Sequence, residues 1–284
     1  MLDWFLVIIA FVGSFIAGVI DLKTTEIPDQ IPYIMAAIGV ISCVIQAIVS
    51  NSFSPVLYSF TAGIGFLAFG IFMYYTGQWG GGDAKLLSAL GFLLGNVSVN
   101  EKLFFPLPLS LFFNVFFIGA IYMILYAIVL TFMNKKIWFE FLHQIKSNTK
   151  MLVLLNITIA FILILFGILS MNFLVGLNFM ELVFIEVKLV FIVVFLFFVW
   201  RFSKTVEDVG FKRKIPVSEL KEGDVLLDSK LWEGLTKEQV KEIKKSGKKH
   251  VWIKEGVRFG MAFPLALLFT IFVGDGLILL ARII

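Results

Sequence analysis

The chain reads TGQWGGGDAK over Thr76–Lys85, and this stretch separates two apolar segments. Its three consecutive glycines, Gly80, Gly81 and Gly82, let the backbone approach another backbone or a bound peptide without an intervening side chain. Asp83 then opens the next apolar segment. A carboxylate at the mouth of a membrane segment is costly and marks a candidate functional site, but Asp is also a favoured helix cap. The stretch alone leaves both interpretations open.

The composition of the chain indicates a membrane protein. It is 60% hydrophobic and 15% charged, with 33 phenylalanines among 284 residues, whereas soluble domains are about 45–50% apolar and about 25% charged. The apolar blocks are roughly 15–28 residues long, which suits helices that cross a bilayer rather than barrel strands. We expect an all-α integral membrane protein with about eight transmembrane helices and a small α+β cytoplasmic insertion before the last helix.

Apolar and polar stretches alternate along the chain and predict four regions. These are a membrane core, a basic loop with two further helices, an α+β appendage and a final transmembrane helix, over residues 1–133, 134–201, 202–256 and 257–284. The expected helices cover Trp4–Ile20, Ile31–Val49, Val56–Tyr75, Asp83–Leu94, Pro106–Phe132, Met151–Leu174, Phe179–Trp200 and Val257–Ala281.

The polar block before the last helix has its own pattern. Ile215–Leu227 is typical of strand, turn and strand, Thr236–Lys245 has the N-cap Thr of a short helix, and Val251–Ile253 is typical of a returning strand. The lysine-rich helix suits binding to anionic lipid headgroups. No groove-reading or stacking pattern accompanies the lysines, so we do not expect nucleic-acid binding.

The distribution of positive charge predicts an orientation. If the N-terminus lies outside, all but three of the 24 Lys and Arg residues fall on the cytoplasmic side; the exceptions are Lys102, Lys188 and Arg282. We therefore expect a multi-pass protein of the cell membrane with its N-terminus outside. In this orientation Asp21, at the end of the first helix, and Asp83 lie at the same cytoplasmic membrane face.

Two features of the first predicted helices argue against a cleaved signal peptide and against cysteine-based sites. Asp3 precedes the first apolar segment without a Lys or Arg, and no small-residue cleavage site follows, so we expect a retained helix rather than a cleaved signal peptide. Cys43 is the single cysteine, which excludes an internal disulfide or a cysteine-based zinc site within one chain.

Two carboxylates at one depth have the chemistry to hydrolyse an amide with water and no metal. One acts as base on the water, and the other as acid toward the carbonyl oxygen or the leaving nitrogen. Held close together they cannot both ionise, so the pair shares a proton. The alternative is two independent helix caps at the membrane interface.

The surrounding residues carry a family resemblance. The element Gly80-Gly81-Gly82-Asp83 fits the pattern Gly-x-Gly-Asp, and Asp21 is followed by Glu26-Ile27-Pro28-Asp29. Together they resemble the prepilin peptidase family of membrane aspartyl proteases, in particular its archaeal prepilin and preflagellin (prearchaellin) branch. The motif resemblance covers roughly residues 1–95. The bacterial members' paired-Cys insert is lacking, so peptidase activity is implied without methyltransferase activity.

The resemblance implies an aspartic endopeptidase that removes the basic leader from pilin or archaellin precursors at the cytoplasmic membrane face. Asp21 and Asp83 would be catalytic, with the division between base and acid left open, and the three glycines would let the substrate strand approach. Asp29 and Lys85 are possible supporting residues, although a Pro-Asp pair entering a helix is more simply a cap. No metal or organic cofactor is expected, and the substrate range, pilins or archaellins or both, stays open.

Two alternatives remain from the sequence. A presenilin or signal-peptide-peptidase type of intramembrane protease shares Gly-x-Gly-Asp, but places its first Asp in a Tyr-Asp pair in mid-membrane, where this chain has Ile20-Asp21 at a helix end. A cation-coupled transporter would use Asp21 and Asp83 as cation ligands and often shows inverted repeats with paired broken helices, which this sequence does not show. Asp275, in Gly274-Asp275-Gly276, lies toward the outer end of the last helix and is left out of the site.

Overall fold

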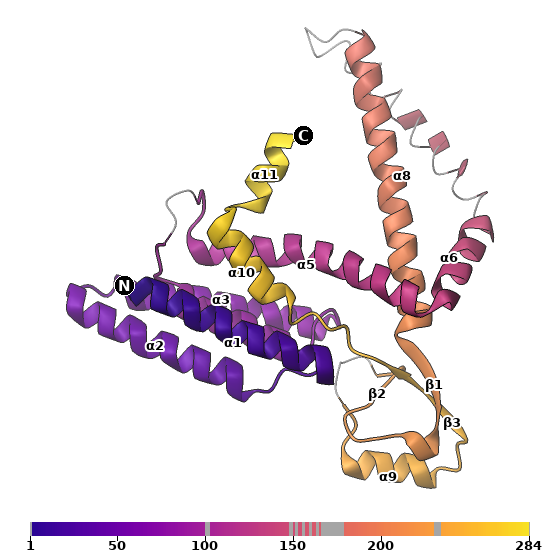
Figure 1. Ribbon diagram of the computed structural model, residues 1–284, viewed down its shortest axis with the longest axis horizontal. Coiled ribbons are helices and arrows are strands. Elements are labelled where there is room, and N and C mark those ends of the chain that lie inside the picture. The colour runs from indigo at the N-terminus through magenta and orange to yellow at the C-terminus, as the bar shows by residue number, and fades with distance from the viewer. Residues whose placement is uncertain are drawn as a thin grey trace. The chain divides into compact units, whose positions relative to one another are not determined.

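The computed structural model describes residues 2–99, 103–147, 179–229 and 234–283, with scattered positions between 150 and 165 (Figure 1). Most of the expected helix over Met151–Leu174 lies outside the described residues. The chain divides into two compact units, Met1–Leu125 with Lys212–Ile284, and Tyr126–Phe211. The first unit contains both candidate aspartates.

The helices follow the predicted apolar segments at the start of the chain. Their bounds are α1 Leu2–Thr24, α2 Gln30–Ser50, α3 Ser54–Tyr75, α4 Gly81–Leu94 and α5 Leu107–Met133. Among the described residues, α1, α2, α3 and α5 are long and apolar enough to cross a membrane. The fourteen-residue α4 is not one of these candidate spans.

Helix α1 turns one face toward the protein. Its buried residues include Ala10, Ser14, Ala17 and Asp21, which recur every three or four positions and so share one side of the helix. The other faces carry exposed apolar side chains such as Phe5 and Ile8, as expected for a surface in contact with lipid. Asp21 therefore lies in the last turn of a helix that continues to Thr24, with its side chain on the inward face.

Helix α4 packs against α2 and α3 with its backbone close to theirs. A Cβ atom added to Gly39 of α2 would lie 2.6 Å from the Phe92 carbonyl carbon, and one added to Gly91 would lie 2.8 Å from the Ala62 carbonyl carbon. Small residues allow such close helix contacts inside membranes. Nearly every residue of α4 after Lys85 is buried, and together with α1 it forms the main hydrophobic core.

The described part of the α+β insertion, which leaves out residues 230–233, has three strands and one helix. The strands β1 Lys212–Pro216, β2 Val225–Leu226 and β3 His250–Lys254 form an antiparallel sheet in the order β1-β3-β2. The 3₁₀ turn η1 covers Val217–Glu219, and α9 covers Lys237–Lys245. Thr236 caps α9, since its hydroxyl accepts a hydrogen bond from the Gln239 N–H. The predicted strands and helix of this block are confirmed, with different bounds.

The last predicted helix is broken, which corrects the expectation of one helix over Val257–Ala281. The chain instead forms α10 Ala262–Phe272 and α11 Gly276–Ile283. Gly274 between them has a φ of +107°, a conformation that only glycine adopts freely. Asn114 of α5 holds the break, because its side chain bonds the Thr270 hydroxyl, the Gly274 carbonyl and the Gly276 N–H.

In its described residues, the second unit contains the end of α5 and two more helices, α6 Lys135–Ser147 and α8 Phe179–Gly210. The predicted basic loop after residue 133 is therefore wrong for this segment, which is an amphipathic helix with Ile137 and Phe141 buried on one face. The predicted helix ending at Trp200 continues to Gly210. A small cluster of Ala127, Ile137 and Val206 joins the three helices.

Candidate active site

Asp21 is buried, with 5% of its surface exposed. Its Oδ2 accepts a hydrogen bond from the Gly260 N–H, over 2.8 Å between the nitrogen and the oxygen. Gly260 lies 239 positions later in the chain, just before α10. One carboxylate oxygen of Asp21 is thus held by backbone from a part of the chain far away in sequence. Asp21 also lines a cavity.

Asp83 lies in the first turn of α4, in a helix that begins two residues earlier than predicted. Its Oδ2 accepts a hydrogen bond from the Gly80 N–H, 3.1 Å away. This bond closes the stretch Gly80–Gly82, which we call the glycine loop, onto the carboxylate. A negative charge is also favourable near a helix N-terminus. Asp83 is thus not the N-cap residue that the cap interpretation expected: Gly80 is the N-cap, and Asp83, three positions later, accepts its N–H through one of two carboxylate oxygens.

The three glycines have different surroundings. A Cβ added to Gly82 would lie 2.8 Å from the Ile27 Cβ, so this glycine allows the glycine loop to contact the segment that follows α1. A Cβ on Gly81 would have no neighbour closer than Tyr74 Cε2 at 3.9 Å. Close backbone approach is required at Gly82, whereas Gly81 lines a cavity and would place a Cβ at an ordinary contact distance.

Trp79 anchors the glycine loop from the other side. It is buried, and its ring stacks on Phe116 at a centroid distance of 5.6 Å and lies 5.7 Å from the Phe259 ring. Aromatic pairs in this range add about 0.5–1.5 kcal/mol beyond their buried area. The residue directly before Gly80 is therefore fixed in the core, which limits how far Asp83 can move.

Both aspartates line one cavity of about 530 Å³. All its charged lining residues are acidic: Asp21, Glu26, Asp29 and Asp83, and none of its lining residues in the described chain is Lys or Arg. The glycine loop, Trp79 and Gln78 form one wall, and Gly223, Gly234, Val257 and Phe259 form another. The structure therefore brings the two sequence-predicted aspartates into one negatively charged space.

The environment of Asp83 favours its protonated form. Burial, and next the negative charge of Asp21, raise the pKa of the Asp83 carboxyl from 3.8 to about 7, and the Gly80 N–H acts in the opposite direction. Two carboxylates that repel each other take up and lose protons as a coupled pair. An acid and a base can therefore be present together near neutral pH.

Asp29, which lines the cavity, forms an ion pair with Lys85. The Lys85 Nζ lies 2.6 Å from Asp29 Oδ1, and it also lies 5.6 Å from the Tyr33 ring centroid. Asp29 occupies the N-cap position of α2, but its side chain makes no cap hydrogen bond. The simpler interpretation of Asp29 as a cap is thus wrong for its side chain, which links the loop after α1 to α4.

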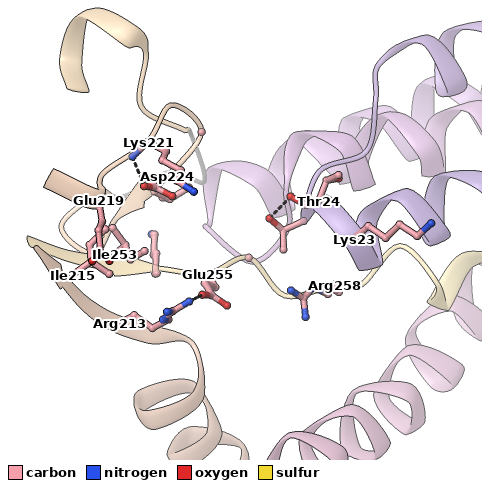
Figure 2. A pocket seen from close by; sticks show the side chains of 15 residues that line it. Lys23, Thr24, Arg213, Ile215, Glu219, Lys221, Asp224, Ile253, Glu255 and Arg258 are labelled. Atoms are coloured by element: carbon pink, nitrogen blue, oxygen red, sulfur yellow. Dashed lines mark hydrogen bonds and ion pairs between the residues drawn. The ribbon is translucent and has the colours of Figure 1, made fainter. Parts of the chain in front are cut away.

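A second cavity of about 520 Å³ adjoins the first (Figure 2). The two share Thr25, Gly223, Val225 and Gly256 in their linings. The second lies where the end of α1 meets the α+β insertion, and its charges are mixed: Lys23, Arg213, Glu219, Lys221, Asp224, Lys254, Glu255 and Arg258. Arg213 pairs with Glu255 at 2.7 Å. Among the described residues, no group of three or more His, Cys, Asp or Glu side chains is placed to hold a metal ion.

The sequence reasoning missed Gly260, Glu26 and Trp79 as residues of the site. In the sequence, Glu26 stands out only as part of the Glu26-Ile27-Pro28-Asp29 element, and Trp79 only as the residue before the glycines. Gly260 has no local signal at all, because a glycine before an apolar segment is common. Only the fold brings its N–H to Asp21.

Comparisons with known proteins match the part of the chain that contains both aspartates. Residues 8–124 match the model of the type IV leader peptidase family. The chain is 32% identical over 136 residues to the preflagellin peptidase of Methanococcus voltae, a match that covers 44% of this chain and 56% of that protein. The match thus spans little more than half of the relative's length. Residues 8–124, which carry Asp21, the glycine loop and Asp83, are therefore similar to the type IV leader peptidase family.

Proposed function

We propose that this protein is a membrane aspartic endopeptidase that removes the leader peptide from type IV pilin-like or archaellin precursors. The observation that carries the proposal is the shared acidic cavity, in which Asp21 and Asp83 face the same space and the pKa of Asp83 is raised to about 7. The family of residues 8–124 and the similarity to a preflagellin peptidase support the substrate class.

The two carboxylates divide the work according to their protonation states, because the pKa of Asp83 is raised to about 7. Asp83 keeps its proton near neutral pH and gives it to the carbonyl oxygen or the leaving nitrogen of the scissile amide. Asp21, held by the Gly260 N–H, acts as the base that takes a proton from the attacking water. After the amide breaks, the proton that Asp21 took from water passes to Asp83, which restores both carboxyl groups to their starting forms.

The substrate enters as an extended strand along the open side of the glycine loop. Gly81 lines the same cavity as Asp83 and carries no side chain, so a peptide backbone can approach Asp83 there. The acidic lining attracts the basic leader and lowers the cost of bringing positive charge to the membrane surface. With the N-terminus outside, this cavity faces the cytoplasm, and the hydrophobic helix of the precursor remains in the bilayer.

The proposal is tested by incubating the purified full chain with a pilin precursor and an archaellin precursor. Leader removal appears as a size shift, and mass spectrometry of the product locates the cleaved bond. Asp21→Asn and Asp83→Asn should each lower cleavage by at least about a hundredfold, since general acid–base catalysis contributes roughly 10²–10⁴-fold.

Asp3→Asn provides the matched control, because Asp3 lies in the first turn of the same helix as Asp21 and does not line the cavity. Its cleavage rate should equal that of the unsubstituted protein. Absence of cleavage across both precursor classes, or full activity of either aspartate variant in an inserted protein, contradicts the proposal.

A further inference from the structure

A six-residue segment connects the α+β insertion to α10 and passes both aspartates. It covers Gly256–Met261, between Glu255, which follows β3, and Ala262 at the start of α10, and we call it the strap. Figure 2 shows Glu255 and Arg258 on this part of the chain, which runs past the end of α1 near Lys23 and Thr24. The strap lies outside the family match over residues 8–124.

Gly260 is the point where the strap contacts Asp21. Besides the 2.8 Å hydrogen bond from its N–H, a Cβ added to Gly260 would lie 3.0 Å from both Cβ and Oδ2 of Asp21 and 3.2 Å from its Cγ. Any side chain at this position therefore presses on the carboxylate itself. Both residues are buried, so the contact has little room to adjust.

The strap also contacts α1 one turn earlier. A Cβ added to Gly18 would lie 2.7 Å from Met261 Sδ, 3.0 Å from Met261 Cα and 3.1 Å from the Gly260 carbonyl carbon. Gly18 and Asp21 are three positions apart and share the inward face of α1. Backbone contact at Gly18 thus sets the distance at which the Gly260 N–H meets Asp21.

Two further contacts hold the strap in place. The Tyr122 hydroxyl donates a hydrogen bond to the Arg258 carbonyl oxygen over 2.8 Å. The Phe259 ring lies 5.7 Å from both Trp79 and Phe263. Since Trp79 directly precedes Gly80, whose N–H bonds Asp83, adjacent strap residues reach both carboxylates: Phe259 through the tryptophan and Gly260 directly.

We propose that the strap is a positioning element of the active site, in which the Gly260 N–H fixes the Asp21 carboxylate and Phe259 fixes the glycine loop that carries Asp83. This inference rests on the proposed peptidase function. Catalytic groups act at full rate only when held close to their productive geometry, and a displacement of about 1 Å can cost about a hundredfold. The carboxyl-terminal part of the chain therefore completes the site that residues 8–124 begin.

The decisive substitution is Gly260→Ala, with Gly65→Ala as the matched control. Gly65 lies in α3, and a Cβ added there has no neighbour within 4 Å. Gly260→Ala should lower kcat at least about tenfold while KM stays within about twofold, because a misplaced base affects the transition state and not precursor binding. Gly65→Ala should leave both constants unchanged. Unchanged kcat in Gly260→Ala overturns the inference.

Tyr122→Phe covers the case in which Gly260→Ala fails to fold. It removes one hydroxyl and keeps the ring, so the strap loses its bond at Arg258 without a new clash. We expect kcat to fall severalfold at constant KM, with thermal stability close to that of the unsubstituted protein. An equal kcat, or a change in KM alone, contradicts a positioning role.

Amide hydrogen exchange tests the contact without reference to cleavage. The exchange of the Gly260 amide should be slow in the unsubstituted protein and in Asp83→Ala, and faster in Asp21→Ala. This pattern, if no precursor is cleaved, rejects the peptidase function and leaves the strap contact intact. Equal exchange in all three proteins, together with active cleavage, rejects the strap and leaves the function intact.

Discussion

At the scale of single residues, the two aspartates differ in what surrounds them although both belong to one cavity. Asp21 accepts a hydrogen bond from the Gly260 N–H, which comes from a distant part of the chain. Asp83 accepts one from the Gly80 N–H, three residues before it. Pairs of carboxyl groups with different surroundings take different protonation states, which is how acid and base roles separate. The difference between Asp21 and Asp83 is therefore the chemically useful feature of the site.

The raised pKa of Asp83 predicts the alkaline side of the pH profile. If Asp83 acts as the acid, cleavage requires its proton, and that proton is lost as the pH rises through about 7. The rate of precursor cleavage should therefore decline above about pH 7. The check is kcat measured between pH 5 and pH 9 on one precursor, and a flat profile up to pH 9 contradicts the assignment.

The pH dependence of thermal stability tests the raised pKa of Asp83 without any measurement of cleavage. The folded state binds the Asp83 proton more tightly than the unfolded state, since the pKa is about 7 when folded against 3.8 ordinarily. The free energy of unfolding therefore falls as the pH rises between these values. Asp83→Asn has no carboxyl group at this position and so lacks this pH-dependent destabilisation. The difference in Tm between the variant and the unsubstituted protein should therefore be more favourable to the variant at pH 8 than at pH 4.

The ion pair between Lys85 and Asp29 should matter little for stability. The side chains are 34% and 53% exposed, and exposed pairs contribute about 0–1 kcal/mol. Lys85→Met should lower the Tm by no more than a few degrees and cleavage by less than about tenfold, measured on the same precursor. A loss as large as that of Asp83→Asn would instead place Lys85 or its partner in contact with the substrate.

At the scale of elements, α4 owes its position to glycine. Gly91→Ala should destabilise the protein by about 1–3 kcal/mol, the usual cost of adding a methyl group to a packed site, because its Cβ would meet the Ala62 backbone at 2.8 Å. Thermal unfolding in detergent measures the effect. Gly65→Ala on the neighbouring helix, where the added Cβ meets nothing within 4 Å, should leave the Tm unchanged.

The sequence predicted the first helices well, because their apolar runs are long and end at polar or glycine-rich stretches. It was wrong where a helix is amphipathic or interrupted. The lysines of α6 suggested a loop, although Ile137 and Phe141 are spaced as one helical face. The sequence also predicted one helix running through Gly274, where the structure has a break. Its cause, the three hydrogen bonds from Asn114, is a tertiary contact that no local pattern contains.

At the scale of the whole molecule, charge distribution predicts the orientation in the membrane. Cys43 is buried and is the single cysteine, so Cys43→Ser gives a background for labelling. Ser52→Cys, in the exposed turn after α2, should react with an impermeant maleimide in intact cells. Ser246→Cys, after α9, should react only once the membrane is permeabilised. The reverse pattern contradicts an N-terminus outside.

The same scale sets the limit of prediction for the site. Asp21, the glycine loop and Asp83 lie within the first 83 residues, and their motifs could be interpreted without a structure. Gly260 is 239 positions from its partner, and Phe259 acts through a ring contact with Trp79. Such contacts depend on where α10 packs, so the pair of aspartates was predictable and the segment between β3 and α10 was not.

The close packing of α4 has a consequence for how this protein responds to its lipids. When bilayer thickness changes, spanning helices adapt by tilting, at a cost of fractions of a kcal/mol per Å. Helix α4 has fourteen residues, is not among the candidate spans of the described chain, and contacts α2 and α3 through backbone at Gly39 and Gly91. Asp83 should therefore move with its two neighbouring helices as one body, and its depth should follow protein packing instead of membrane thickness.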